Sequence, residues 1–207
     1  EWIDTAVRKN PANVKKIRLT LTAGNSSFWA GYATKPRIII IVTDYSLPKN
    51  PFRLMVSPFR IDEKSPFRTI KTLSFIIEMT SRKKAYATGF DDALLLNRAG
   101  NVAETSSANI FWANQGNLYT PPLSAGCLNG MTRKHILRIA KENNITAYER
   151  NIKLKNLLSA QEIFITSSLK LILPVVNIQA EKSFRYKAGK LTNRLQQLLL
   201  DDIMGVK

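Results

Sequence analysis

Two charged side chains of the 207-residue chain, Lys71 and Glu104, have surroundings in which they could take part in chemistry. Lys71 begins an apolar segment that continues through Leu73, and a lysine held against apolar surface has a lowered pKa and can form a Schiff base. Glu104 opens the stretch ETSSANIFW, in which small residues precede a bulky apolar strand. Each residue also has an ordinary interpretation: a surface lysine lying along apolar side chains, and a solvated loop carboxylate. The pair therefore gains meaning only together with further residues.

Two other stretches have the residue types of an anion site. Gly130-Met131-Thr132-Arg133 leads into a helical pattern. A glycine there would allow close approach of a ligand, and the first helix amides carry partial positive charge. Ser167 and Ser168 follow an apolar strand directly, so their hydroxyls could close the other side of a phosphate site. The ordinary alternatives are a threonine-capped helix and a serine-containing loop.

The counts of cysteine and histidine exclude other kinds of site. Cys127 is the one cysteine of the sequence, and His135 is the one histidine. A single cysteine cannot form a disulfide within the chain, and these two residues alone cannot make a Cys/His metal site. The sequence therefore predicts no metal site, and we interpret Cys127 as a buried small residue.

Helical and strand patterns are mixed along the chain without strict strand–helix–strand alternation, which indicates an α+β fold. The expected strands are rich in β-branched and aromatic residues and lie at 17–22, 37–42, 110–112, 118–120, 162–166 and from 174. The expected helices lie at 2–9, at 71–86, from 130 and around 191–199. A stretch rich in Pro, Ser and charge at 62–66 marks the expected boundary between a small α/β domain, residues 1–66, and a larger domain, residues 67–207.

The formal net charge of +16 favours an anionic ligand. The basic residues are spread along the chain, and no nucleic-acid motif stands out, so we expect a pocket for an anionic small molecule rather than nucleic-acid binding. No apolar run approaches the ~18 to 20 residues needed to span a bilayer, and no leader pattern opens the sequence. We therefore expect no membrane association and a cytoplasmic location.

The order of these stretches resembles one enzyme family. Lys71, the Glu104 to Asn109 stretch, LNGMTR at 128–133, FITSS at 164–168 and Pro174 follow one another as in the class IV (fold type IV) pyridoxal-phosphate enzymes. The resemblance runs from about Lys15 to Leu199. It implies a two-domain fold type IV enzyme with pyridoxal 5'-phosphate as cofactor.

The resemblance also implies roles for individual residues. Lys71 matches the lysine that holds the cofactor covalently and then moves protons. Glu104 matches the carboxylate that keeps a proton on the pyridine nitrogen, and small residues after it would leave room for the ring. The other matched positions lie around the ring or the phosphate: Asn109 closing the Glu104 motif, Leu128 against the ring, Met131 and Thr132 with phosphate-binding amides, and Ser167 and Ser168 in a second phosphate loop.

Two features depart from the family pattern. Many members have arginine just before the glycine of an early loop, where this chain has Ala23. The family also has a further N-terminal segment with a phosphate-binding arginine, for which the sequence shows no counterpart. We therefore expect the small N-terminal domain to be incomplete.

Within this family, three short motifs resemble those of the lyases. These enzymes convert 4-amino-4-deoxychorismate to 4-aminobenzoate and pyruvate in folate biosynthesis. The three motifs are Leu128-Asn129-Gly130, Phe111-Trp112 and Gly31-Tyr32. The alternatives are an aminotransferase for D-amino acids or branched-chain amino acids, and a folded relic that binds cofactor poorly. The resemblance also implies a homodimer.

Overall fold

The computed structural model describes residues 1–11, 13, 15–24, 35–48 and 50–205, and it divides into two compact units, residues 1–48 and 49–207. In the smaller unit, helix α1 (Trp2–Arg8) is followed by the antiparallel strands β1 (Lys15–Thr22) and β2 (Arg37–Asp44). The strands expected at 17–22 and 37–42 are therefore present. The Gly31-Tyr32 motif lies outside the described residues.

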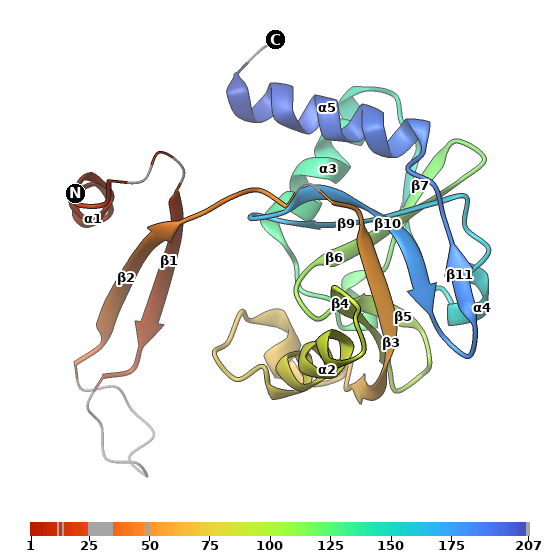
Figure 1. Ribbon diagram of the computed structural model, residues 1–207, viewed down its shortest axis with the longest axis horizontal. Coiled ribbons are helices and arrows are strands. Elements are labelled where there is room, and N and C mark those ends of the chain that lie inside the picture. The colour runs from red at the N-terminus through yellow and green to blue at the C-terminus, as the bar shows by residue number, and fades with distance from the viewer. Residues whose placement is uncertain (12, 14, 25–34, 49, 206–207) are drawn as a thin grey trace. The chain divides into compact units, whose positions relative to one another are not determined.

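The larger unit is built on one nine-stranded sheet (Figure 1). Its strands are β3 (Phe52–Ile61), β4 (Asp92–Asn97), β5 (Val102–Thr105), β6 (Asn109–Asn114), β7 (Asn117–Thr120), β8 (Ala147–Glu149), β9 (Glu162–Ser167), β10 (Leu171–Gln179) and β11 (Ser183–Arg185). They run in the order β5-β4-β3-β10-β9-β6-β7-β8, with β11 beside β10. Parallel and antiparallel pairs occur in the same sheet, and the expected α+β organisation is confirmed.

The boundary between units lies earlier than the sequence indicated. We expected it at 66/67, because the composition changes there, but the compact units separate at 48/49. The physical reason is β3, which pairs with β4 on one side and β10 on the other and so belongs to the large sheet.

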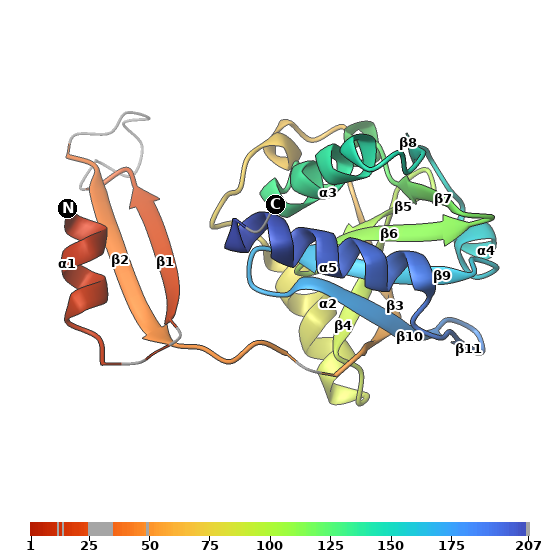
Figure 2. The ribbon, with the colours of Figure 1, turned by 90° about the horizontal axis from the view of Figure 1, so that it is seen from above.

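Helices cover this sheet from different sides (Figures 1 and 2). The helical segments of the larger unit are η1 (Pro66–Thr69), α2 (Ile76–Ala87), η2 (Leu123–Ala125), α3 (Met131–Glu142), α4 (Leu154–Leu157) and α5 (Lys190–Met204). Helices α3 and α5 pack on each other and on β9, whereas α2 packs on β3 and β4. None of the helices in the described ranges combines the length and apolar character needed to cross a membrane.

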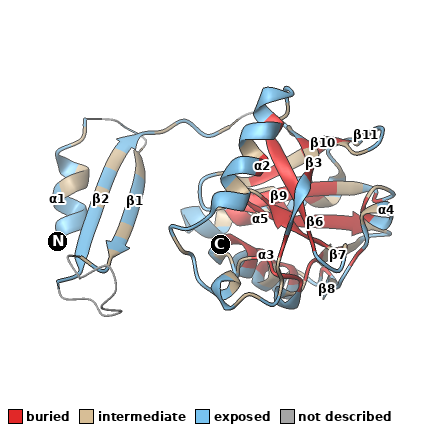
Figure 3. Ribbon diagram, turned by 90° about the horizontal axis from the view of Figure 1, so that it is seen from below, coloured by how far each residue is buried: buried red, intermediate tan, exposed pale blue. Residues whose placement is uncertain are grey.

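The core is divided between the two faces of the central strands. Ile110 and Trp112 face a cluster that includes Leu94 and Ile165, whereas Phe111 lies under α3 and α5. This is the alternation expected of a strand. Figure 3 shows the buried residues concentrated in the strands of the larger unit. The strand that follows Glu104 is therefore fixed by apolar packing on both faces.

Helix α2 differs from its sequence prediction in two ways. It begins at Ile76 rather than at Lys71, because Thr72 bonds locally to Ser74: its hydroxyl donates to the Ser74 carbonyl and accepts from the Ser74 amide, both at 3.0 Å. Such local bonds compete with a helical start. Its buried residues are the small Ser81 and Ala85, whereas Ile76 is 75% exposed. Small residues let this helix approach the sheet closely, and its larger apolar residues are left outside.

Candidate active site

Glu104 is a buried carboxylate with both oxygens engaged. It lies on β5 opposite Leu95 of β4, and 7% of the residue is exposed. Its Oε1 pairs with Nη2 of Arg68, and its Oε2 accepts a hydrogen bond from the Leu128 amide at 3.0 Å. The side chain is not the solvated loop residue of the ordinary interpretation.

Burial raises the pKa of Glu104 to about 7. The positive charge of Arg68 and the hydrogen bond from Leu128 oppose this rise, as does the charge of Lys71 more weakly. The negative charge of Glu78 adds to the rise. With this pKa the protonated and ionised forms are about equally populated at neutral pH, and a ligand that brings a cation to this carboxylate would favour the ionised form.

The backbone of Leu128 joins Glu104 to Asn109. The Leu128 amide bonds Glu104, and its carbonyl accepts a hydrogen bond from Nδ2 of Asn109 at 2.8 Å. Asn109 in turn lies so close to Gly130 that an added Cβ there would be 2.2 Å from its Oδ1. A Cβ at position 130 would therefore push against the Asn109 amide, and three of the expected site residues, Glu104, Asn109 and Leu128, meet here.

The first turn of α3 has the form of an anion site. Its N-cap is Gly130, which contributes no side-chain hydrogen bond, so the alternative of a threonine cap is wrong. Met131 is exposed and Thr132 is buried at this end. Arg133 is used elsewhere, because its Nη2 donates to the Pro121 carbonyl at 2.9 Å and pairs with Glu149. The uncapped amides of the first turn are the groups that bind anions.

The end of β9 adds one hydroxyl group, that of Thr166, on the side of the sheet that α3 covers. Thr166 is paired in register with Asn109, so the two side chains share the face covered by α3. Thr166 is 1% exposed, and its Oγ1 has no hydrogen-bond partner among the described residues. Ser167 follows it, accepting the Lys170 amide at 3.2 Å, and Ser168 is exposed. A buried hydroxyl without a partner is unusual, and here it adds an unused donor to the side of the sheet that α3 covers.

Lys71 lies between η1 and α2 in a segment without regular secondary structure, and its side chain is exposed. The apolar enclosure considered for it from sequence is not present among the described residues. Its charge nevertheless acts on Glu104. The positive charge of Lys71 thus lowers the pKa of the Glu104 carboxyl. Lys71 itself lies outside the helices on either side of it.

Asp92 is a residue of this region that the sequence did not indicate. Its carboxylate is fully buried at the start of β4 and accepts the hydroxyls of Thr105 at 2.9 Å, Ser107 at 2.5 Å and Ser106. Lys170 also donates to the Ser107 hydroxyl, at 2.9 Å. The small residues after Glu104 therefore turn their hydroxyls to Asp92. One acid among 15 gives no sequence signal for this role.

The arrangement has two chemically different ends. One is a buried carboxylate suited to a cation, and the other is an uncapped helix start with an unpaired hydroxyl, suited to an anion. Leu128, two residues before Gly130, links them. This donor set fits an elongated ligand that carries a cationic nitrogen at one end and a phosphate at the other.

Comparisons with known proteins point to one family. The family model described as Amino-transferase class IV matches residues 1–178. The chain is 29% identical over 176 residues to the D-alanine aminotransferase of Bacillus licheniformis, covering 84% of this chain and 62% of that protein. It is also 29% identical over 196 residues to the aminodeoxychorismate lyase of Bacillus subtilis, covering 92% of this chain and 66% of that protein. The chain thus spans about two thirds of the length of these relatives.

A solved structure has the same fold. It is a crystal structure of a putative 4-amino-4-deoxychorismate lyase from Legionella pneumophila, with a TM-score of 0.90 and 26% identity, covering 96% of this chain and 74% of that one. The expected fold type IV architecture is therefore confirmed.

Proposed function

The chain belongs to the class IV aminotransferase family, and from that premise we propose that it is a pyridoxal-phosphate-dependent lyase. The reaction is cleavage of 4-amino-4-deoxychorismate to 4-aminobenzoate and pyruvate, a step of folate biosynthesis. The single observation that carries the cofactor assignment is the buried Glu104 carboxylate, tied through Leu128 to the uncapped start of α3.

The residues present fit this cofactor. Glu104 would pair with the ring nitrogen, the amides of Met131 and Thr132 would bind the phosphate with Ser167 and Ser168, and Lys71 would hold the cofactor covalently. Asn109 would support the site by fixing the Leu128 carbonyl. The Leu128 side chain, which is half-buried, is the candidate for contact with the ring.

When bound, pyridoxal phosphate supplies an electron sink, which is strongest when its ring nitrogen is protonated. Glu104 holds that proton at the nitrogen, because an anion within hydrogen-bond reach favours the cationic form. Lys71, once its amine is free, removes a proton from the carbon that bears the substrate nitrogen and returns a proton as pyruvate leaves. The bond between the ring carbon and the pyruvate oxygen breaks, and the ring becomes aromatic.

Two observations support the lyase branch. The match to the lyase of Bacillus subtilis covers 92% of this chain, against 84% for the D-alanine aminotransferase at the same identity. The Legionella structure also carries a lyase name. The second candidate function, transamination of D-amino acids or branched-chain amino acids, is favoured by the D-alanine aminotransferase match. A basic chain suits either class of anionic substrate.

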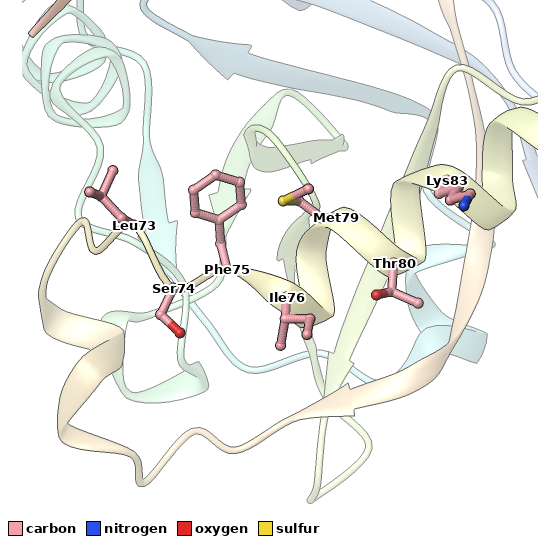
Figure 4. Close-up of a pocket in the computed structure, with 7 residues that line it drawn as sticks. All are labelled: Leu73, Ser74, Phe75, Ile76, Met79, Thr80 and Lys83. Atoms are coloured by element: carbon pink, nitrogen blue, oxygen red, sulfur yellow. The ribbon is translucent and has the colours of Figure 1, made fainter. Parts of the chain in front are cut away.

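We also propose that the chain forms a homodimer. Leu73, Phe75, Ile76 and Met79 line a groove of about 400 Å³ at the start of α2, and all four are exposed (Figure 4). In Figure 4 the side chains of Leu73, Phe75 and Met79 lie above the ribbon, and that of Ile76 lies below it. Contiguous exposed apolar side chains are typical of a surface that a partner covers.

The cytoplasmic location stays a prediction.

The first test is covalent cofactor binding. Purified full-length protein mixed with pyridoxal phosphate should show the visible absorption band of a lysine-bound cofactor. Lys71→Ala should abolish that band, whereas Lys64→Ala, in a nearby loop, should retain it. A band that survives Lys71→Ala would show that another lysine holds the cofactor.

The second test separates the reactions. Incubation with 4-amino-4-deoxychorismate should give equal amounts of 4-aminobenzoate and pyruvate. Rapid amino-group exchange between D-alanine and 2-oxoglutarate, without those products, would assign the chain to the aminotransferases. If the protein shows neither the absorption band nor turnover of either substrate, the result supports the third alternative, a folded relic that binds cofactor poorly.

A further inference from the structure

Arg68 reaches the candidate site from outside every motif that the sequence brought forward. It lies in η1, three residues before Lys71, and 19% of its side chain is exposed. Its Nε donates to the Gly126 carbonyl at 2.7 Å, Nη1 pairs with Glu78 of α2, and Nη2 pairs with Glu104 of β5. One guanidinium therefore ties η1 to a helix, a strand and the loop before α3.

The contact with Glu104 completes the support of that carboxylate. Arg68 holds Oε1, and the Leu128 amide holds Oε2. A carboxylate held on both oxygens cannot swing away from its position without breaking a bond. Each oxygen retains a lone pair, because a carboxylate accepts about four hydrogen bonds in all. A ring nitrogen could therefore bind Glu104 without displacing either neighbour.

Resting on the function proposed above, we propose that Arg68 is a positioning residue of the candidate site. It holds the Glu104 carboxylate in place, favours its ionised form, and ties it to the segment that carries Lys71. Arginine suits this role because its planar group offers several donors in a fixed arrangement and stays charged. Arg68 acts through Glu104.

The charged groups around Glu104 determine in which direction its pKa should shift when each of them is removed. Arg68 and Lys71 lower its pKa, and Glu78 raises it. Cys127 is a further titratable neighbour, and its own pKa is raised to about 11 by burial and by Glu104, so it is neutral in the relevant range. Loss of Arg68 should therefore raise the pKa of Glu104, whereas loss of the Glu78 charge should lower it. An arginine that acted only through Glu78 and the Gly126 carbonyl would leave the pKa of Glu104 unchanged when it is lost.

The experiment compares Arg68→Gln, Arg68→Lys and Glu78→Gln with the unaltered full chain. The first readout needs no cofactor: chemical unfolding of the cofactor-free protein is measured between pH 5 and 9. The pH at which stability levels off should move up by about one unit or more in Arg68→Gln and down in Glu78→Gln. Arg68→Lys, which keeps the charge, should stay close to the unaltered protein.

The second readout is the affinity for pyridoxal phosphate at pH 7, followed by quenching of tryptophan fluorescence. It should fall roughly fivefold in Arg68→Gln for the first unit by which the pKa rises, and roughly tenfold for each further unit. Equal loss of stability at every pH, with no shift of the levelling point, would overturn the proposal. If Arg68→Gln does not fold, an unchanged or upward shift in Glu78→Gln overturns it instead. Shifts of the expected signs without any binding of pyridoxal phosphate would support the role of Arg68 and count against the proposed function alone.

Discussion

The two ends of the candidate site are built in opposite ways. At the carboxylate end, the protein itself partners both oxygens of Glu104, with Arg68 and the Leu128 amide. At the other end, α3 starts without a side-chain cap, and the buried Thr166 hydroxyl has no partner among the described residues. Changes at the first end should thus alter the protein without its cofactor, and changes at the second should be felt mainly when a ligand binds.

Glu104→Gln should give the largest effect and tests the first half of this comparison. Because the folded protein holds the Glu104 proton up to about pH 7, whereas the unfolded chain releases it near 4.5, stability falls as pH rises through that window. The fall amounts to ~3 kcal/mol. Glutamine keeps the shape and has no charge to lose, so the variant should lack this fall. Chemical unfolding across the pH range measures it.

The same variant should bind pyridoxal phosphate more weakly, by roughly tenfold to a hundredfold, because a hydrogen bond to a charged group is worth about 1.5–3 kcal/mol. Glu142→Gln is the matched control, since Glu142 is an exposed acid on α3 that pairs with Arg138. It should change neither quantity. An unchanged pH dependence in Glu104→Gln would mean that another group titrates in this window.

The sequence indicated the parts of the site that depend on local pattern. Gly130 and the amides after it could be read from a helix start, and the alternating burial of Ile110, Phe111 and Trp112 follows from strand geometry. The helix start and the alternating burial are local features, so neighbouring residues in the chain are enough to specify them. The fold was predicted differently, through the resemblance that the order of the motifs carries.

Contacts between segments that are distant in the chain could not be predicted from local sequence pattern. Arg68 and Glu104 are 36 positions apart, and Arg68 is one of 31 basic residues. Asp92 reaches Ser107 across 15 positions. The start of α2 was missed for a related reason: the apolar residues that resembled a buried helix face are exposed, and Ser81 is buried instead. Which groups meet across a sheet depends on the register between strands that are distant in the chain, and local sequence pattern does not reveal that register.

Gly130→Ala tests whether the two ends are mechanically joined. The backbone of Gly130 has φ −64°, which alanine adopts freely, so the cost comes from the Cβ meeting Asn109. Displacing Asn109 breaks its bond to Leu128, which also holds Glu104. We expect a loss of about 1–3 kcal/mol in the free energy of unfolding, together with weaker cofactor binding.

The control for Gly130→Ala is a double-mutant cycle with Asn109→Ala. If the clash with the Asn109 amide is the cause, the second substitution removes it, and the two losses are not additive. Additive losses would locate the cost elsewhere in the first turn of α3. The two ends would then be independent.

Thr166→Val should give the smallest effect of these substitutions. It should leave the cofactor-free protein as stable as before or more stable, and it should weaken the binding of pyridoxal phosphate. Valine matches the shape of threonine and removes a hydroxyl that has no partner in the described structure, so cofactor-free stability should be unchanged or higher by up to about 1 kcal/mol. If the hydroxyl serves a bound phosphate, pyridoxal phosphate affinity should fall by about threefold to tenfold. Thr166→Ser keeps the hydroxyl and should keep the affinity. A valine variant that is clearly less stable without cofactor would show that the hydroxyl is already bonded in the folded protein, and the contrast between the two ends would fail at this residue.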